Sequence, residues 1–226
     1  MSSMGVFDIL GPIMIGPSSS HTAGAARLGK VARIIAGDDV VEVTFLLHGS
    51  FGKTYRGHGT DRALVAGIMG MEPSDERLRD SLEIAKEKGI KITFKDVDLG
   101  DYHPNTVKFL MKLKNGKEAE VIGCSIGGGN IEIVEINGNQ VKFTGTYSTI
   151  ITSHKDIPGT VAKVTNILYD SDVNIAFLTL GRSQKGKNAT MTFELDGKIS
   201  EDLIEEIKKV NGIEKVIYIN KIEDGE

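Results

Sequence analysis

Residues 156–180 read DIPGTVAKVTNILYDSDVNIAFLTL, and this stretch decides the fold of the second half of the chain. A proline–glycine turn is followed by apolar residues at helical spacing, namely Val161, Val164 and Leu168. Spacing of three and four residues places such side chains on one face of a helix. The pattern predicts a helix from Thr160 to Asp170, followed by an apolar strand.

The segments on either side of this stretch complete a longer order of elements. A strand, TYSTIITSH, precedes it, and a polar turn, a strand, ATMTFELDG, a helix from Ser200 to about Val210 and a last strand, IEKVIYI, follow it. The resulting order, βαββαβ, is that of the split-βαβ or ferredoxin-like arrangement. The sequence therefore predicts a ferredoxin-like domain over residues 148–222 and a separate domain over residues 1–145.

The first 145 residues mix helical and strand patterns, so we expect an α+β domain there. Helices are predicted from Thr22 to about Ala36 with Ser20 as N-cap, after the GHGTDR turn with Thr60 or Asp61 as cap, and from Ser74 to Lys88. Strands are predicted at VVEVTFLLHG and KITFKDVDL, and in two hairpins that turn at Asn115-Gly116 and Asn137-Gly138.

The composition excludes several classes of function. The net charge is -4, tryptophan is absent and no basic run is interleaved with aromatic residues, so nucleic acid is not an expected partner. No apolar run is long enough to span a bilayer and no signal peptide is recognisable, so we expect a cytoplasmic protein without a membrane partner. The single cysteine, Cys124, cannot hold an iron–sulfur cluster alone, and its strand-like context favours a buried structural thiol.

Two histidines stand at predicted helix beginnings, and both are candidates for binding or proton transfer. Residues 16–24 read GPSSSHTAG, so that hydroxyl side chains bracket His21 where free backbone N–H groups favour an anion. The second motif, GHGTDR, places His58 between glycines that permit close approach of a substrate. Histidine is suited to proton transfer near neutral pH. The alternative is a capped serine-rich loop and two ordinary loop histidines.

Other motifs carry weaker signals. The run Gly127-Gly128-Gly129-Asn130 predicts either a bulge or backbone amides that are open to a ligand. Residues 48–54, HGSFGKT, end like a phosphate-binding loop, but Leu47 stands where that loop requires glycine, so no nucleotide site is predicted. His103 and His154 are solitary and typical of turn or surface histidines. Neither HExxH nor paired CxxC occurs, so no metal site is predicted in this chain.

The segments FDILGPIMIGPSSSHTAGAARLG and GHGTDRALVAG, with HPNT and the triple glycine before Asn130, closely resemble the β chain of bacterial iron–sulfur L-serine dehydratase. That family converts L-serine to pyruvate and ammonia. The first domain also resembles the allosteric substrate-binding domain of phosphoglycerate dehydrogenase. The C-terminal part resembles an ACT domain, which implies a ligand loop made of Asp156, Pro158, Gly159, Asn174 and Ile175.

The resemblance assigns roles to the histidine motifs. It implies that His58 removes the Cα proton of L-serine and that His21 is a polar contact or proton donor, although the two roles could be exchanged. It also implies that hydroxyl, amide and backbone groups bind the substrate, namely those of Ser18, Ser19, Ser20, Thr22, Gly59, Thr60 and Asn130.

The resemblance further implies a 4Fe-4S cluster, and no pyridoxal phosphate, with an open iron as Lewis acid on the substrate hydroxyl. The cluster-binding cysteines are expected on a separate L-serine dehydratase α chain, so this chain alone should be inactive. ACT domains commonly pair, so a homodimer is expected. The alternative is a non-catalytic regulatory module that senses an amino acid or another anion. Only the enzyme hypothesis requires the two histidines to converge.

Overall fold

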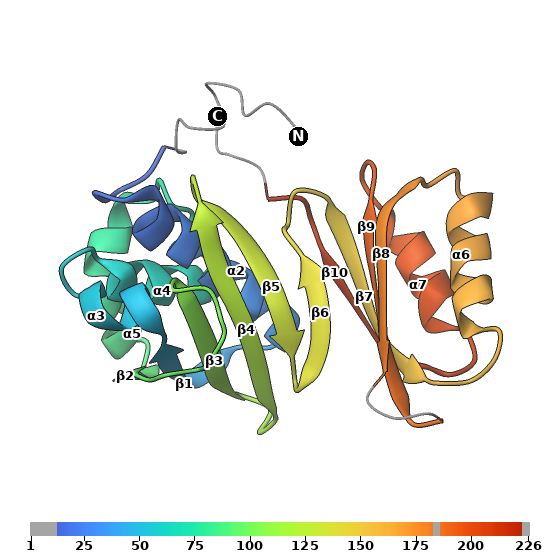
Figure 1. Cartoon of the computed structure of the whole chain (residues 1–226), viewed down its shortest axis with the longest axis horizontal. Helices are drawn as coiled ribbons and strands as arrows, with labels where there is room; N and C mark the ends of the chain where they lie inside the picture. The colour runs from blue at the N-terminus through green and yellow to red at the C-terminus, as the bar shows by residue number, and fades with distance from the viewer. Residues whose placement is uncertain (1–12, 183–185, 223–226) are drawn as a thin grey trace. The chain divides into compact units, whose positions relative to one another are not determined.

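The computed structural model describes residues 13–182 and 186–222, which form two compact units (Figure 1). The units divide between Asn137 and Gly138, inside a β-hairpin turn. Both residues have positive φ angles, 49° and 76°, as the central residues of a type I′ turn require. The asparagine–glycine pair therefore forms the hairpin turn that the sequence predicts.

The first unit is built on a six-stranded sheet with the order β2-β1-β3-β4-β5-β6. The strands are β1 (Val40–Leu47), β2 (Lys91–Asp96), β3 (Thr106–Leu113), β4 (Glu118–Gly127), β5 (Asn130–Ile136) and β6 (Asn139–Phe143), the last lying beyond the division as the second arm of the hairpin. β1 pairs with β2 in parallel, whereas β1–β3, β3–β4 and β4–β5 are antiparallel. The predicted α+β class is confirmed.

The helices of the first unit cover one face of this sheet. They are η1 (Ser19–Gly24), α2 (Ala25–Ala36), α3 (Gly49–Thr54), α4 (Thr60–Ile68), η2 (Glu76–Asp80) and α5 (Ser81–Glu87). Alternate residues of β1 and β3, such as Phe45 and Phe109, are fully buried, and their rings meet edge to face at 5.5 Å. Period-two burial of this kind directs one face of a sheet into the core.

Close packing between α2 and α4 depends on two glycines. A Cβ atom on Gly67 would lie 2.1 Å from the carbonyl oxygen of Ala26, and one on Gly29 would lie 2.5 Å from that of Leu64. No side chain fits at either position, so the two backbones can approach directly. This contact holds together the two helices whose N-terminal ends carry the histidine motifs.

Three predicted helix boundaries are wrong. The first helix begins earlier, as the π-helical turn η1, and its N-cap is Ser18 and not Ser20, because Ser18 is the residue with extended backbone. The cap of α4 is Gly59, at φ 72°, and neither Thr60 nor Asp61. The single helix predicted over residues 74–88 is divided into η2 and α5, with Asp75 capping the first of them.

The second unit is an antiparallel four-stranded sheet with the order β10-β7-β9-β8. Its elements are β7 (Ser148–Lys155), α6 (Thr160–Asp170), β8 (Ile175–Arg182), β9 (Asn188–Leu195), α7 (Glu201–Lys208) and β10 (Ile213–Ile219). Helix α6 has the predicted limits, and α7 begins after its N-cap Ser200. The ferredoxin-like βαββαβ arrangement is therefore confirmed.

The core of the second unit joins both helices to one face of the sheet. Val164 and Leu168 of α6 and Leu203 and Ile207 of α7 pack in one buried cluster with apolar residues of β7 and β9. The side chains predicted to face inward thus do so at the centre of each helix, while Val161 and Val210 lie at the margin of the cluster. Within the described residues, each helix is too short or too polar to cross a bilayer.

Candidate functional site

The first histidine motif is organised by Ser18. Its hydroxyl accepts a hydrogen bond from the backbone N–H of His21 at 3.4 Å, which satisfies one of the free amides at the start of η1. The same oxygen lies 3.3 Å from Nδ1 of His21. The cap therefore fixes both the turn and one side of the imidazole ring.

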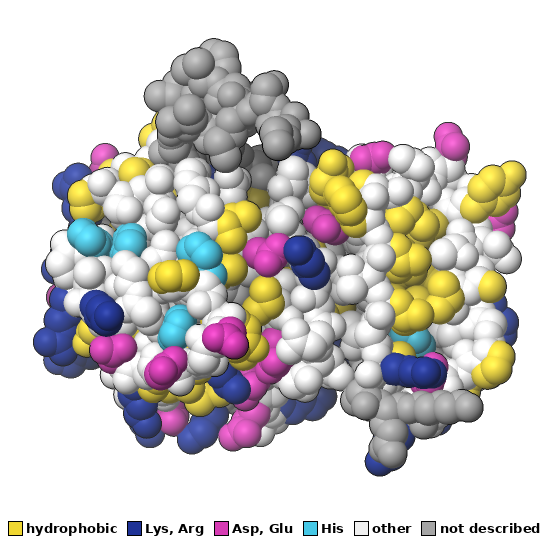
Figure 2. Space-filling model, viewed as in Figure 1, with side chains coloured by type: hydrophobic (Ala, Val, Ile, Leu, Met, Phe, Trp, Pro, Cys, Tyr) yellow, Lys and Arg dark blue, Asp and Glu magenta, His cyan; other side chains and the backbone are white. Residues whose placement is uncertain are grey.

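The two candidate histidines converge. The ring centroids of His21 and His58 are 4.7 Å apart, and the planes meet at 69°. His21 is buried and also packs edge to face on Phe51 at 5.2 Å, whereas His58 is exposed. Histidine side chains gather on the face of the first unit seen in Figure 2. The two motifs, far apart in the sequence, thus form one site.

A third element, α3, completes the surroundings of His21. Ser50 Oγ lies 3.3 Å and Thr54 Oγ1 3.2 Å from Nε2 of that ring. Both hydroxyls come from the segment 48–54, HGSFGKT, which resembles only the end of a phosphate-binding loop. The spacing of four residues, one helical turn, was the available signal that the two hydroxyls share a helix face.

The HPNT segment places α3 beside the histidines. The carbonyl oxygen of Pro104 accepts hydrogen bonds from the backbone N–H groups of Ser50 and Phe51, at 2.8 and 3.3 Å. Gly49 is needed there, because a Cβ atom would lie 2.8 Å from the Cα atom of Pro104. The ring of His103 accepts a hydrogen bond from the backbone N–H of Asn105, and its carbonyl oxygen accepts one from the hydroxyl of Thr106. The motif therefore acts by holding a neighbouring helix.

The hydroxyl groups around His21 favour one tautomer of its ring. Thr54 donates its single hydroxyl proton to the carbonyl oxygen of Ser50 at 2.8 Å, so its oxygen can only accept from His21. Nε2 must then carry the proton, and Nδ1 accepts from the hydroxyl of Ser18. We assign His21 as the neutral Nε2–H tautomer on this hydrogen-bond pattern.

The electrostatic surroundings also keep His21 neutral. Burial lowers the pKa of His21, and the neighbouring His58 lowers that pKa further. Asp61, in the first turn of α4, has its pKa raised because burial outweighs its bonds to the backbone of Arg62. His58, by contrast, has no ring hydrogen bond among the described residues, so its nitrogens are open to a ligand.

A surface hollow of about 350 Å³ lies beside His58. Of the predicted site residues, Thr22 and Gly59 also line it. Three arginines that sequence reasoning missed, Arg56, Arg62 and Arg79, complete its wall. Arg56 directly precedes the GHGTDR motif and Arg62 is its last residue, whereas Arg79 comes from η2, so no local sequence pattern groups Arg79 with the other two.

The other predicted binding residues are dispersed around this site. Ser19 and Ser20 are half-buried in η1, and their side chains make no hydrogen bond within the described residues. Thr60 is fully buried, and its hydroxyl has no partner among the described residues. Asn130 is exposed at the start of β5, and its carbonyl oxygen accepts weakly from Ser125 at 3.5 Å. None of these four lines the hollow among its described residues.

The triple glycine forms the tight turn between β4 and β5. All three glycines have positive φ angles, between 61° and 107°, which side chains other than glycine rarely adopt. The carbonyl oxygen of Gly129 accepts a hydrogen bond of 2.7 Å from the buried guanidinium of Arg27 in α2. The structure thus ties this turn to the helix that follows His21.

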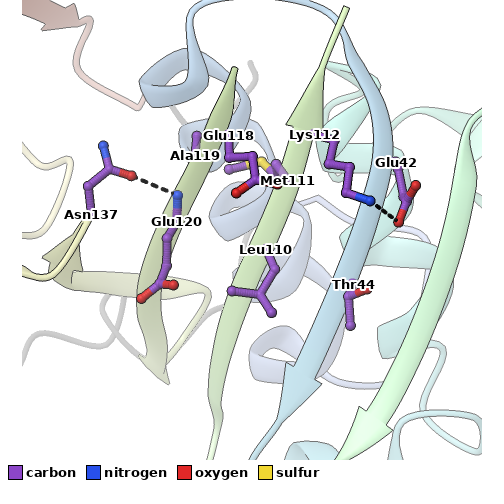
Figure 3. Close-up of a pocket in the computed structure, with 9 residues that line it drawn as sticks. All are labelled: Glu42, Thr44, Leu110, Met111, Lys112, Glu118, Ala119, Glu120 and Asn137. Atoms are coloured by element: carbon purple, nitrogen blue, oxygen red, sulfur yellow. Dashed lines mark hydrogen bonds and ion pairs between the residues drawn. The ribbon is translucent and has the colours of Figure 1, made fainter. Parts of the chain in front are cut away.

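A second hollow, of about 440 Å³, lies on the open face of the sheet. Figure 3 shows Leu110 between the side chains of Glu120 and Thr44, with the ion pair of Glu42 and Lys112 above Thr44 in this view. The histidines are absent from its lining. This hollow therefore lies apart from the candidate site.

The single cysteine is structural. Cys124 is 4% exposed in β4, and burial, together with the charge of Glu132, raises its pKa to about 11. A thiol with so high a pKa is a poor nucleophile and metal ligand near neutral pH. No group of three potential metal ligands occurs within the described residues. The predicted buried thiol is confirmed.

The predicted ligand residues of the second unit lie at two ends of its sheet. Asp156 accepts hydrogen bonds from Gly186 N–H and from Arg182, which holds its pKa low. Asn174 instead bonds Asp196 at 2.7 Å, at the other end of β8. Seven residues of strand, about 23 Å, separate the two ends. One copy of the unit therefore does not bring them together.

Elsewhere in this unit, Gly159, at φ 89°, is the N-cap of α6 directly after Pro158, and Ile175 is the first residue of β8. His154 is buried and not at the surface as predicted, and burial lowers its pKa. It faces Thr152 within the same strand, at 3.4 Å from the hydroxyl.

Two family models match the chain. The model for the serine dehydratase beta chain matches residues 5–85, which include both histidine motifs. The model for the ACT domain matches residues 148–212, within the ferredoxin-like unit. The predicted ACT domain is thereby confirmed.

Curated relatives match over nearly the full length. The chain is 44% identical to the L-serine dehydratase beta chain of Peptoniphilus asaccharolyticus, covering 97% of this chain and 99% of that one. It is 42% identical to the probable L-serine dehydratase beta chain of Bacillus subtilis, covering 99% of this chain and 100% of that one. A more distant relative, the D-3-phosphoglycerate dehydrogenase of Methanocaldococcus jannaschii, is 28% identical, over 91% of this chain and 39% of that enzyme.

Proposed function

This chain belongs to the family of L-serine dehydratase β chains, and from that premise we propose that it forms one wall of the active site that converts L-serine to pyruvate and ammonia. The observation that carries the proposal is the convergence of His21 and His58 at 4.7 Å. The reaction needs a base for a weakly acidic Cα–H beside a poor hydroxide leaving group.

His58 is the base in this proposal. Its ring is exposed, lines the hollow and makes no hydrogen bond among the described residues, so a nitrogen lone pair can accept the Cα proton. As that proton moves to His58, the C–H electron pair forms the Cα–Cβ double bond and hydroxide leaves Cβ. The resulting 2-aminoacrylate hydrolyses to pyruvate and ammonia.

His21 has a different role. Both of its ring nitrogens are engaged by hydroxyls, and burial disfavours its protonated form. It lies outside the described lining of the hollow and contacts the ring of His58. We therefore propose that it is a fixed neighbour of His58, whose neutral ring does not repel the proton arriving on that base.

The 4Fe-4S cluster that we propose for the complete enzyme does not fit this chain. Cys124 is the only cysteine, it is buried and its pKa is raised. The described residues contain no other group suited to a metal. We therefore assign the cluster to a separate α chain, which docks on the side where the hollow is open.

The competing function is a regulatory module that binds an anion and performs no chemistry. Such a module needs a hollow but does not need two converging imidazoles. The distant relative named phosphoglycerate dehydrogenase is 28% identical to this chain over only 39% of its own length, whereas the β chains match from end to end. The convergence of the two imidazoles and the end-to-end match with the β chains both favour a chain that supplies part of a catalytic site.

We also propose that the chain forms a homodimer through its ACT domain. Strand β8 is an edge strand that exposes Phe177, Leu178 and Leu180 by 58%, 43% and 55%. Apolar side chains on both faces of an edge are a template for pairing with another strand. Antiparallel pairing of two β8 strands about a two-fold axis would place Asn174 of one copy near Asp156 of the other.

The test of catalysis is reconstitution. The chain is purified alone and together with a cysteine-rich α chain, and pyruvate formation from L-serine is followed without oxygen. We expect turnover only in the mixture, and a loss of at least about a thousandfold in kcat for His58→Gln, as expected for removal of a general base.

The folding control for His58→Gln is thermal unfolding, which should be unchanged because the exposed ring supports little of the core. Turnover by the lone chain would refute the half-site proposal. Full activity of His58→Gln in the reconstituted enzyme would exclude this residue as the base.

A further inference from the structure

Three guanidinium groups surround the hollow beside His58. Arg56, Arg62 and Arg79 line it together with the backbone of several glycines, and no carboxylate is among the described lining residues. Asp61 is close enough to Arg62 and Arg56 for an electrostatic interaction, but it lies outside this lining. The hollow is therefore a region of positive potential.

Arg79 differs from Arg77, its neighbour in the same short helix, η2. Arg77 forms a forked ion pair with Asp75, with bonds of 2.6 and 2.9 Å. Within the described part of the chain, none of the three lining arginines forms an ion pair; Arg56 only stacks on Tyr55, at 5.3 Å. Arg77 and Arg79, two positions apart in η2, thus differ in their interactions. The guanidinium of Arg77 is paired with Asp75, whereas that of Arg79 is open to a ligand.

A second observation is independent of the arginines. Thr22 is 1% exposed, and its hydroxyl has no hydrogen-bond partner among the described residues. A Cβ atom on Gly16 would lie 2.3 Å from this hydroxyl, and Gly16 also lines the hollow. The hydroxyl of Thr22 thus lies next to Gly16 in the wall of the hollow, where an oxygen of a ligand could accept its hydrogen bond.

We propose that this hollow is the subsite for the carboxylate of a small amino acid, held by Arg62, Arg79 and Arg56, with Thr22 as an additional donor. A guanidinium matches a carboxylate in geometry and charge. The assignment rests on the proposed function for the identity of the amino acid. In this proposal the substrate carboxylate binds to the arginines and not at the serine-rich turn around His21. Ser18 then has the separate role of holding the ring of His21.

The test is a titration of the isotope-labelled full-length chain at low ionic strength, in which the ring resonances of His58 report binding. L-Serine and glycine should shift them saturably, and L-serinamide, which lacks the carboxylate, should not. Arg79→Gln and Arg62→Gln should each raise Kd by about tenfold, whereas Arg77→Gln, the matched control, should change it by less than about twofold.

Glycine has no hydroxyl to eliminate, so its binding tests the subsite separately from dehydratase activity. Arginine-dependent binding of glycine supports the subsite even if reconstitution yields no turnover. The proposal is overturned if neither amino acid shifts His58 saturably, if L-serinamide binds equally well, or if Arg77→Gln weakens binding as much as Arg79→Gln.

Discussion

Replacing Thr54 by valine tests the assignment of His21 directly. Valine keeps the shape of threonine but removes the hydroxyl that accepts from Nε2 of His21 at 3.2 Å and donates to Ser50 at 2.8 Å. A net contribution of about 1 kcal/mol for each hydrogen bond predicts a loss of about 1–2 kcal/mol in the free energy of unfolding. The Nε2–H tautomer loses one acceptor, so the tautomer ratio should shift by about fivefold toward Nδ1–H.

The assay is long-range proton–nitrogen NMR of the histidine rings at neutral pH, with His21 assigned by its loss in His21→Gln. Thr54→Ser retains the hydroxyl and should keep the wild-type tautomer. Thr165→Val is the matched control, because Thr165 makes the same bond one turn back, to Val161 at 3.1 Å, but bonds no histidine among the described residues. That variant should lose stability without changing His21.

Two results would refute the assignment. One is a wild-type His21 that already carries its proton on Nδ1. The other is a tautomer ratio of His21 that stays the same in Thr54→Val or changes equally in Thr165→Val. Either outcome would show that the tautomer does not depend on the hydroxyl of Thr54.

Further measurements address packing, pH and thiol reactivity. Gly67→Ala should lower the free energy of unfolding by about 2 kcal/mol in urea, because its Cβ atom would overlap a carbonyl of α2, while Gly57→Ala, with a nearest contact of 3.7 Å, should cost much less. The pKa values of His21 and His154 are lowered in the folded chain, so the unfolded chain takes up protons at a higher pH than the folded chain does. The free energy of unfolding should therefore fall as the pH drops below about 6.5. A urea midpoint that stays constant from about pH 7.5 to 5.5 would contradict this. Cys124 should react with a thiol reagent at pH 8 at least about a hundredfold faster in urea than in the native chain, and equal rates would exclude a buried thiol.

The ferredoxin-like unit was predictable because its signals are local. Pro158 and Gly159 stop one element, and apolar residues then recur every three or four positions, so α6 has the predicted limits of Thr160 and Asp170. Where local signals competed, the prediction failed. The chain around Asp75 offers its own cap, which divides the expected helix into η2 and α5.

The histidine motifs were recognisable for the same reason, since each combines small residues with a helix beginning. Their functional surroundings were not. Ser50 and Thr54 contact a ring 29 and 33 positions away, and they reach it because Gly49 allows α3 to pack on Pro104. The spacing within the segment 48–54 indicates that the two hydroxyls share a helix face, but nothing in that segment indicates that they contact His21.

The sequence by itself determined the order of the elements in the ferredoxin-like unit, the family and the two imidazoles, because hydrophobic period, turn residues and short motifs depend on neighbours within a few positions. It did not predict helix α3 in the first unit. The tertiary structure alone decided which hydroxyls hold His21, and that Arg79 but not Arg77 is open beside His58. The first choice depends on long-range packing, because Gly49 lets α3 pack on Pro104 and reach His21. The second depends on where η2 packs beside His58, since Arg77 is already paired with Asp75, two positions away.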